Sequence, residues 1–565
     1  MTEIERILAL PSGEPPPLPV ALEGIRPAQS LALREYVRAL HTPASPLGER
    51  GCVVGLGCGH GKTLVGLLIP VVHKAVTGKD PRVLYLLPAP LVEQFHRDLA
   101  DWATVYPIVI GGQFVMSHEQ LSAPSGKHKL RDIAPDLVII DEGHRYGVSE
   151  SARWRRLREF IVSSPKTRIV VMSGSLLWDS VLNARHLLVA ALRDWAPVPL
   201  DSVIERWAAA IDVGSTPSQE DRRALEPLRA WAGSDDDRRA FHVRLWTAPG
   251  VALTSDVATD RPLRCVFWRP SVTVPPEVAA AVAGLECGWT LPDGTELVSI
   301  ADYTRAADTL AFGFYHRWKP PVDEHWLEVR QRWAGELRAL VEYAPGVYQT
   351  PGDVLRFARA GKLDVRRQRL YDAWVEIEPY GPERETVWLD GAEDYVRRVV
   401  ETWAAGDGLT ADFGQGKPVV WVRNPELGEL VARATGWTYH GAGSEPPSGL
   451  PAVCSIAVHG TGWNTAPAHG YTRSLVLQLP AGGRMWEQLL SRLHRDSHRS
   501  AAADEIVFTL FGGTRRSYSA LNNAVAGARF ARDTTGATQR LLLANWQGIS
   551  INRVSPGTHN EEEEE

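Results

Sequence analysis

The chain has 565 residues, of which 44% are hydrophobic and 23% charged, and its formal net charge at pH 7 is −6. This length exceeds what one hydrophobic core supports, so we expect roughly three or four units. No stretch approaches the roughly 20 uninterrupted apolar residues of a membrane span, and residues 1–10 lack the basic-then-apolar order of a signal peptide. The sequence therefore predicts a globular, cytoplasmic protein without membrane partners.

The cysteine positions and the charge distribution narrow the class of protein only slightly. The five cysteines are scattered and form no Cys-x-x-Cys pair, which argues against a disulfide framework or a zinc cluster. The glutamates at 561–565 carry five of the negative charges, so the remaining chain is near neutral and its global charge does not indicate whether it binds nucleic acid. We expect residues 1–23 to form an extension and residues 551–565 an acidic, disordered tail.

From residue 24 to about residue 195, short apolar runs alternate with helical stretches. Expected strands cover residues 52–54, 83–87, 137–140 and 169–172, and expected helices cover residues 64–75 and 91–102. Apolar strands separated by helices predict a parallel sheet covered on both faces, with ligand loops at the carboxyl ends of the strands. The fold class is therefore α/β, with a first domain at residues 24–195.

A glycine-rich turn follows the first expected strand. Residues 55–63 read Gly-Leu-Gly-Cys-Gly-His-Gly-Lys-Thr. The glycines let backbone N–H groups approach phosphate oxygens, Lys62 adds a positive charge for the terminal phosphates, and Thr63 offers a hydroxyl to Mg²⁺. We expect this loop to bind ATP through Gly57, Gly59, Gly61, Lys62 and Thr63.

The third expected strand ends in two carboxylates. Asp141 and Glu142 follow the apolar residues 137–140 directly. In this position Asp141 can hold Mg²⁺ through water, and Glu142 can orient or activate the attacking water. Together with the glycine-rich turn some eighty residues earlier, this strand end predicts an ATP-hydrolysing enzyme.

The middle of the chain, residues 196–388, is rich in tryptophan and arginine and contains no motif with chemistry. We expect a mainly helical insertion here, with Trp268, Trp318, Trp326 and Trp333 mostly in its core. Stacking of one or two of these rings on DNA bases is the minority interpretation.

Alternation resumes in residues 389–550. Expected helices cover residues 395–403, 425–434 and 485–493, and expected strands cover residues 419–422, 455–458, 474–477 and 506–510. This pattern predicts a second α/β domain without a glycine-rich loop. It should place its own loops against the ATP site of the first domain.

One helix of this second domain carries Gln488, Arg492 and Arg495, which are spaced four and three residues apart. This spacing puts the three side chains on one helical face. Arginines from an opposite domain stabilise charge on a transferring phosphoryl group only when the cleft closes, which couples hydrolysis to domain motion. The alternative is an amphipathic surface helix with solvated charges.

Taken in order, these motifs resemble those of superfamily 2 helicases and translocases of the DEAD/DEAH type, and specifically the Swi/Snf remodeller-like branch. Residues 24–29, with Arg26 and Gln29, resemble the leading motif whose glutamine reads adenine. Leu56 replaces the first glycine of the longer phosphate-loop pattern, and this shortened form is typical of helicase-like ATPases. The resemblance covers residues 24–178 and 417–495.

The same resemblance implies further roles. Residues 172–175 and the segment after Glu142 resemble positions that couple the ATP site to the cleft. The residues that would do this are His144, Ser173, Gly174 and Ser175. Residues 460–464, including Gly462, resemble a glycine-rich motif at the interdomain face, and residues 488–495 resemble the helix that supplies arginine fingers. Segments 88–95 and 117–120 resemble loops that grip the nucleic-acid backbone, through Pro88, Gln94 and Ser117, although an ordinary helix start explains them equally well.

The resemblance implies two RecA-like domains that bind ATP and Mg²⁺ between them and act on DNA as a helicase or translocase, with double-stranded DNA favoured and single-stranded DNA possible. Three alternatives remain. The first alternative is an RNA helicase. The second is the motor subunit of a restriction or defence system that needs partners, and the third is a P-loop ATPase that does not act on nucleic acid.

Overall fold

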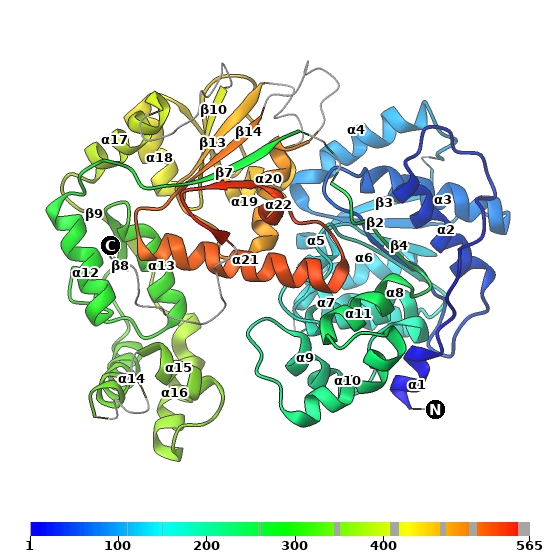
Figure 1. Cartoon of the computed structure of the whole chain (residues 1–565), viewed down its shortest axis with the longest axis horizontal. Helices are drawn as coiled ribbons and strands as arrows, with labels where there is room; N and C mark the ends of the chain where they lie inside the picture. The colour runs from blue at the N-terminus through cyan, green and yellow to red at the C-terminus, as the bar shows by residue number, and fades with distance from the viewer. Residues whose placement is uncertain are drawn as a thin grey trace.

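The computed structural model describes residues 2–551 except residues 110, 150, 258, 260, 344–347, 349–350, 407–416, 464–469 and 496–504. Over these residues the protein is an α/β structure with two parallel sheets, each flanked by helices, lying side by side (Figure 1). None of the helices described combines the length and the apolar character that crossing a membrane requires.

The first sheet has six parallel strands in the order β3-β2-β4-β5-β1-β6. Its central strands are buried along their whole length, as expected of strands covered on both faces. The strands are β1 (Cys52–Gly55), β2 (Val83–Leu87), β3 (Gln113–Ser117), β4 (Leu137–Ile140), β5 (Arg168–Met172) and β6 (Val251–Leu253).

Helices accompany this sheet from the N-terminus onward. They are α1 (Glu3–Leu8), α2 (Pro27–His41), α3 (Lys62–Thr77), α4 (Val92–Ala103), α5 (His118–Ser122), α6 (Gly126–Ile133), α7 (Ala152–Ser163) and α8 (Leu182–Leu192). Three more, α9 (Val203–Ile211), α10 (Gln219–Ala232) and α11 (Asp237–Trp246), share the hydrophobic cluster of α7 and α8. They therefore belong to the first domain.

The second sheet has seven parallel strands in the order β11-β12-β10-β13-β14-β7-β15. They are β7 (Leu263–Trp268), β10 (Lys417–Val422), β11 (Thr438–His440), β12 (Ala452–Ser455), β13 (Tyr471–Val476), β14 (Ile506–Phe511) and β15 (Asn545–Gln547). The accompanying helices are α17 (Ala392–Ala405), α18 (Pro425–Thr435), α19 (Ile456–Gly462), α20 (Gly483–Leu493), α21 (Arg515–Thr535) and α22 (Arg540–Leu543).

Between β7 and α17 the chain forms the helical part of the molecule. It contains α12 (Pro276–Gly288), α13 (Ile300–Leu310), α14 (Glu324–Tyr343), α15 (Pro351–Arg359), α16 (Val365–Ile377) and the antiparallel pair β8 (Phe314–Trp318) and β9 (Arg384–Trp388). Trp326 and Trp333 are buried in its core, as expected, and Trp268 is buried in the second sheet's core. Trp318 packs against the edge of the helical core.

The expected domain boundaries do not coincide with the sheets. Residues 196–388 were expected as one insertion, but β6 pairs with β1 of the first sheet and β7 pairs with β14 of the second. These strands are short, and their partners lie some two hundred residues away, so local sequence does not reveal the pairing. Residues 456–458, expected to continue a strand, instead begin α19.

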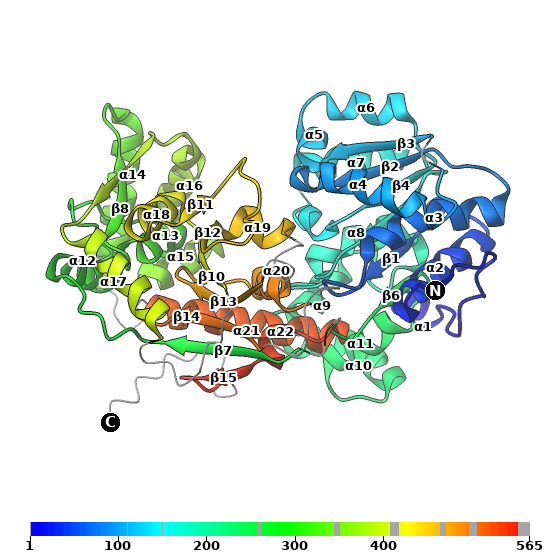
Figure 2. The same ribbon diagram turned by 90° about the horizontal axis from the view of Figure 1, so that it is seen from above.

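Each domain sends a side chain into the other's core. Trp178, which follows β5 of the first sheet, packs in the hydrophobic cluster of the second domain. Phe530, near the end of α21, packs in the cluster of the first domain, where the guanidinium of Arg238 lies 5.4 Å from its ring centre. Figure 2 shows α21 running from the second sheet toward α11. These contacts dock the two domains.

Candidate functional site

Three loops meet at the carboxyl edge of the first sheet. The glycine-rich loop, residues 55–61, follows β1, Asp141 and Glu142 follow β4, and Ser173 follows β5. Because β5 pairs with both β1 and β4, these loops lie next to one another. Ligands of parallel sheets bind at this edge.

The glycine-rich loop is folded into a tight turn. Gly59 and Gly61 have φ values of 93° and 73°, a backbone conformation that residues other than glycine rarely adopt. The Nζ of Lys62 donates to the carbonyl oxygens of Leu56, at 3.1 Å, and Gly57, at 3.4 Å. The Leu56 side chain is buried in the core and only its carbonyl faces the lysine, which explains why no glycine is needed at this position.

Gln29 ties α2 to this loop. Its Nε2 donates to the carbonyl oxygens of His60, at 3.0 Å, and Gly61, at 3.3 Å, and its Oε1 accepts from the backbone N–H of Arg26 at 2.8 Å. The exposed Arg26 side chain donates to the carbonyl of Gly59 at 3.2 Å. The amide nitrogen of Gln29 is thus engaged with the loop. Only the second lone pair of Oε1 is left for the expected recognition of adenine.

The two carboxylates after β4 have different electrostatic surroundings. Burial, followed by the charge of Glu142, raises the pKa of Asp141 to about 6. Burial alone would also raise the pKa of Glu142, but a hydrogen bond from His144 and the charges of Lys62 and Arg492 together hold it well below its ordinary value. Glu142 itself has φ 50° and ψ 49°, a left-handed conformation that is strained for this residue type.

The expected coupling residues lie together. The Nδ1 of His144 is 3.1 Å from Glu142 Oε2, 3.1 Å from Ser173 Oγ and 3.4 Å from Ser175 Oγ. Burial lowers the pKa of His144, and because an ionised carboxylate can only accept, Nδ1 donates in the contact with Glu142. A Cβ atom built on Gly174 would lie 3.1 Å from Lys62 Nζ. The loop after β5 therefore contacts His144 and lies close to Lys62.

The second domain brings arginines to the same place. Arg492, in α20, is 5% exposed, and its charge interacts with those of Glu142 and Arg540. Burial, followed by the charge of Arg492, lowers the pKa of Arg495 to about 9, so the Arg495 side chain stays charged at pH 7. Gln488 is buried in the same helix.

Arg495 does not lie on the helical face predicted for it. The helix ends at Leu493, and His494 leaves helical geometry with ψ 75°. The Nε of Arg495 turns back to donate to the Ser491 carbonyl at 2.8 Å. The chain departs from the helix where the His494 ring is held by Arg540 and by the Arg261 carbonyl.

Sequence reasoning missed Arg540. This residue of α22 donates from Nη2 to the carbonyl of Cys58 in the glycine-rich loop at 3.1 Å. No pattern around residue 540 signals this contact, because its partner is 482 residues away.

A basic surface was also missed. The neighbouring helices α6 and α7 carry seven lysines and arginines against two acidic residues. Lys129, Arg131, Arg155 and Arg158 are exposed. The run of four arginines within residues 153–158 was an available signal.

The expected nucleic-acid residues follow β2 and β3. Pro88 precedes a short 3₁₀ turn, and Gln94 is half-buried in α4. Ser117 is 6% exposed and caps α5, with its Oγ accepting from the Gln120 backbone N–H at 3.0 Å. The Ser117 hydroxyl oxygen therefore serves as the N-cap of this helix. Gly462 is the last residue of α19, and Asn464 lies outside the described residues.

Among the described residues, no group of three or more His, Cys, Asp or Glu side chains is placed to hold a metal ion. A nucleotide-bound Mg²⁺ takes only one or two protein ligands, because phosphates and waters supply the others. Thr63, in the first turn of α3, and Asp141, whose charge interacts with that of Lys62, provide the oxygen ligands that Mg²⁺ prefers. The donor set fits the ion.

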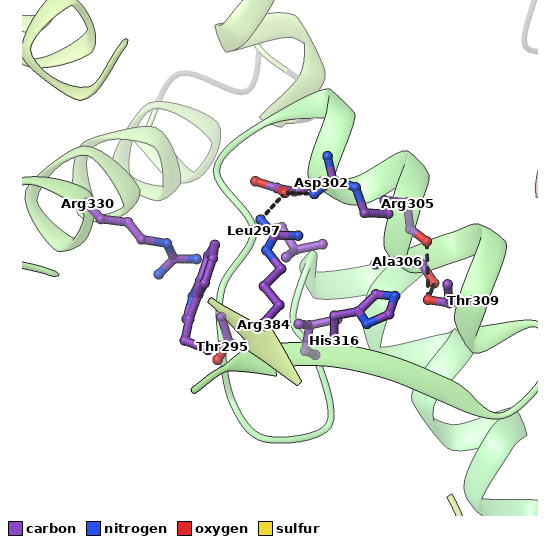
Figure 3. A pocket seen from close by; sticks show the side chains of 11 residues that line it. Thr295, Leu297, Asp302, Arg305, Ala306, Thr309, His316, Arg330 and Arg384 are labelled. Atoms are coloured by element: carbon purple, nitrogen blue, oxygen red, sulfur yellow. Dashed lines mark hydrogen bonds and ion pairs between the residues drawn. The ribbon is translucent and has the colours of Figure 1, made fainter. Parts of the chain in front are cut away.

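A separate hollow lies in the helical part (Figure 3). Arg305 and Arg384 both donate to Asp302 Oδ1, at 3.0 and 2.8 Å, and Arg384 stacks over Trp318 at 4.2 Å. Arg330 donates to a backbone carbonyl beside them. Arg305 and Arg384 thus share Asp302, which ties β9 to α13, and Arg330 ties α14 to the segment before α13.

The arrangement at the sheet edge combines a turn of backbone amides, a lysine, two carboxylates of unlike pKa and two arginines from a second domain. No protein-family model matches the chain, and comparison with curated proteins finds none that is similar. The chemistry of the site therefore rests on its geometry.

Proposed function

We propose that the chain is an ATP-hydrolysing motor that moves along DNA, with two RecA-like domains that bind ATP and Mg²⁺ between them. The observation that carries the proposal is the approach of second-domain arginines to the first domain. The charge of Arg492 interacts with Glu142 and with Cys58 of the glycine-rich loop, and that of Arg495 interacts with Cys58. An ATPase that needs only its first domain has no use for this split site.

Each residue would have a defined task. The glycine-rich loop and Lys62 would bind the phosphates, and Glu142 would orient the attacking water. When bound, Mg²⁺ would neutralise charge on the phosphate oxygens, held by Thr63 and Asp141. Arg492 and Arg495 would stabilise the transferring phosphoryl group, so that hydrolysis requires the docked arrangement of the domains.

DNA as the track is supported by the motifs that resemble remodeller-type translocases and by the basic surface of α6 and α7. Exposed lysines and arginines in this number suit contact with phosphates that is independent of base sequence. Such binding should weaken steeply as the salt concentration rises.

The test is the ATPase rate without nucleic acid and with double-stranded DNA, single-stranded DNA or RNA. We expect the largest stimulation by double-stranded DNA, and none in Lys62→Ala. Greater stimulation by RNA would identify an RNA motor. Hydrolysis indifferent to every nucleic acid would overturn the motor proposal and leave an ATPase of another kind.

A further inference from the structure

Arg540 joins the second domain to the glycine-rich loop of the first. Its side chain is 1% exposed, and each guanidinium nitrogen has a partner. Nη2 donates to the Cys58 carbonyl at 3.1 Å, Nε donates to His494 Nδ1 at 3.2 Å, and Nη1 donates to Glu487 Oε1. Only the first of these partners belongs to the first domain.

The second domain fixes the direction of this guanidinium. Glu487 of α20 binds Arg540 twice, because its Oε2 also accepts from the Arg540 backbone N–H at 2.8 Å. The His494 ring, which accepts at Nδ1, donates from Nε2 to the Arg261 carbonyl at 2.6 Å. A buried charge pair with this many hydrogen bonds is held in one geometry. The Nη2 group therefore points at the loop as part of a rigid unit with α20.

The contact on Cys58 determines where the next amide points. The peptide bond between Cys58 and Gly59 is trans, and in a planar trans peptide the C=O and N–H bonds point in opposite directions. Because Arg540 holds the Cys58 carbonyl, the Gly59 N–H is turned away from α22. Backbone N–H groups of this kind of turn are the donors that approach phosphate oxygens.

The segment that connects the two domains, between β6 and β7, adds hydrogen bonds beside the contact of Arg540 with Cys58. Residues 254–256 lie between β6 of the first sheet and β7 of the second. There the Asp256 carbonyl is 2.9 Å from Nε2 of His60 in the loop, and the Ser255 carbonyl accepts from the Thr538 backbone N–H at 3.3 Å. The loop, the connection and the segment before α22 thus form one hydrogen-bonded assembly.

We propose that Arg540 is a positioning residue for nucleotide phosphates, which presets the Gly59 amide from the second domain and so makes phosphate affinity depend on domain docking. This inference rests on the proposed ATP site. It adds a coupling that the arginine fingers do not provide: domain opening releases the Cys58 carbonyl and weakens phosphate binding. By linkage, a bound phosphate strengthens docking to the same extent.

The test measures the dissociation constant of Mg·ADP by calorimetry. Replacing Arg540 alone would leave Glu487 as an unpaired buried charge, so the variant is the double substitution Arg540→Met with Glu487→Gln. We expect ADP affinity to fall about tenfold, which corresponds to roughly 1.4 kcal/mol. Arg540→Lys, which keeps a donor and a charge, should regain part of this affinity.

The matched control is Arg529→Met. Arg529 is another arginine of the second domain, and its Nη2 donates to the Ile551 carbonyl at 2.6 Å. The ADP affinity of this variant should equal that of the wild type. Unchanged ADP affinity in the folded double variant, or an equal loss in the control, would overturn the role of Arg540. Wild-type protein that binds neither ADP nor ATP would instead refute the proposed function itself.

Discussion

Glu142 Oε2 lies 3.1 Å from Nδ1 of His144, at the point where β4 ends. The imidazole donates to a carboxylate that Lys62 and Arg492 also favour in its charged form, and the pKa of Glu142 is correspondingly low. A carboxylate with so low a pKa is a weak proton acceptor. Glu142 is therefore better suited to holding and polarising the attacking water molecule than to removing a proton from it before the attack.

Glu142→Gln tests this role. The amide is similar in size and keeps one oxygen, but it loses the charge that attracts the water's protons. We expect kcat for ATP hydrolysis to fall by about 100-fold or more, with ADP affinity changed by only a few-fold. The control is Glu119→Gln, which removes a half-exposed carboxylate 3.5 Å from Arg145. Full hydrolysis by Glu142→Gln would show that another group positions the water.

Arg495→Ala tests the contribution of the second domain to hydrolysis. Because Arg495 lies beyond the end of α20 and is partly exposed, its removal should leave the fold intact. Arginine fingers contribute about 1,000-fold or more to kcat, so DNA-stimulated hydrolysis should fall to near background. Arg532→Ala, at an exposed arginine of α21 paired with Asp533, is the control. Normal stimulated turnover in Arg495→Ala would refute the finger assignment.

The parts of the fold that were predictable are those with local signals. Apolar runs bounded by polar residues located β2 and β4 at the observed residues, and helix periodicity located α18 and α20 to within a few residues. The glycine-rich loop and the carboxylates after β4 were identified because each motif lies at a strand end. Their proximity followed from the parallel topology.

The remainder depends on contacts between distant residues. The six-residue strand β7 carries no mark of its partner β14, and Arg540 lies in a segment with no motif. The end of α20 at Leu493 depends on how Arg540 and Arg261 bind the His494 ring. Spacing alone therefore placed Arg495 on a helical face that it does not occupy.

Gly527→Ala tests the docking of the two domains. A Cβ atom at Gly527 of α21 would lie 2.7 Å from Nε1 of Trp178, the first-domain side chain that packs in the second domain's core. The ring must shift, which we expect to lower the free energy of unfolding by about 1–3 kcal/mol and to increase proteolysis between the domains.

Gly335→Ala is the matched control, because its Cβ in α14 would meet no atom within 4 Å. Alanine there should stabilise the helix by up to about 1 kcal/mol. Thermal denaturation of both variants compares the two effects. If Gly527→Ala melts at or above the wild-type temperature, Trp178 is not confined between the domains as described.

The buried ring of His118 makes stability depend on pH. Its Nε2 lies 3.0 Å from the Asp141 carbonyl and its Nδ1 lies 3.0 Å from the Tyr146 hydroxyl. Burial lowers the pKa of His118 to about 3, whereas in the unfolded chain it is about 6.5. Between these values the unfolded chain binds a proton that the folded protein does not, so acidification favours unfolding.

We expect His118 to reduce the free energy of unfolding by about 1 kcal/mol for each pH unit below 6.5. Urea denaturation at pH 7, 6 and 5 measures the slope for wild type and His118→Gln. The variant is destabilised at pH 7 by the loss of two buried contacts, but its deficit should shrink as the pH falls because glutamine does not titrate. His128→Gln, at an exposed position of α6, should follow the wild-type slope. Parallel curves for wild type and His118→Gln would mean that the ring at position 118 takes up a proton equally well in the folded protein.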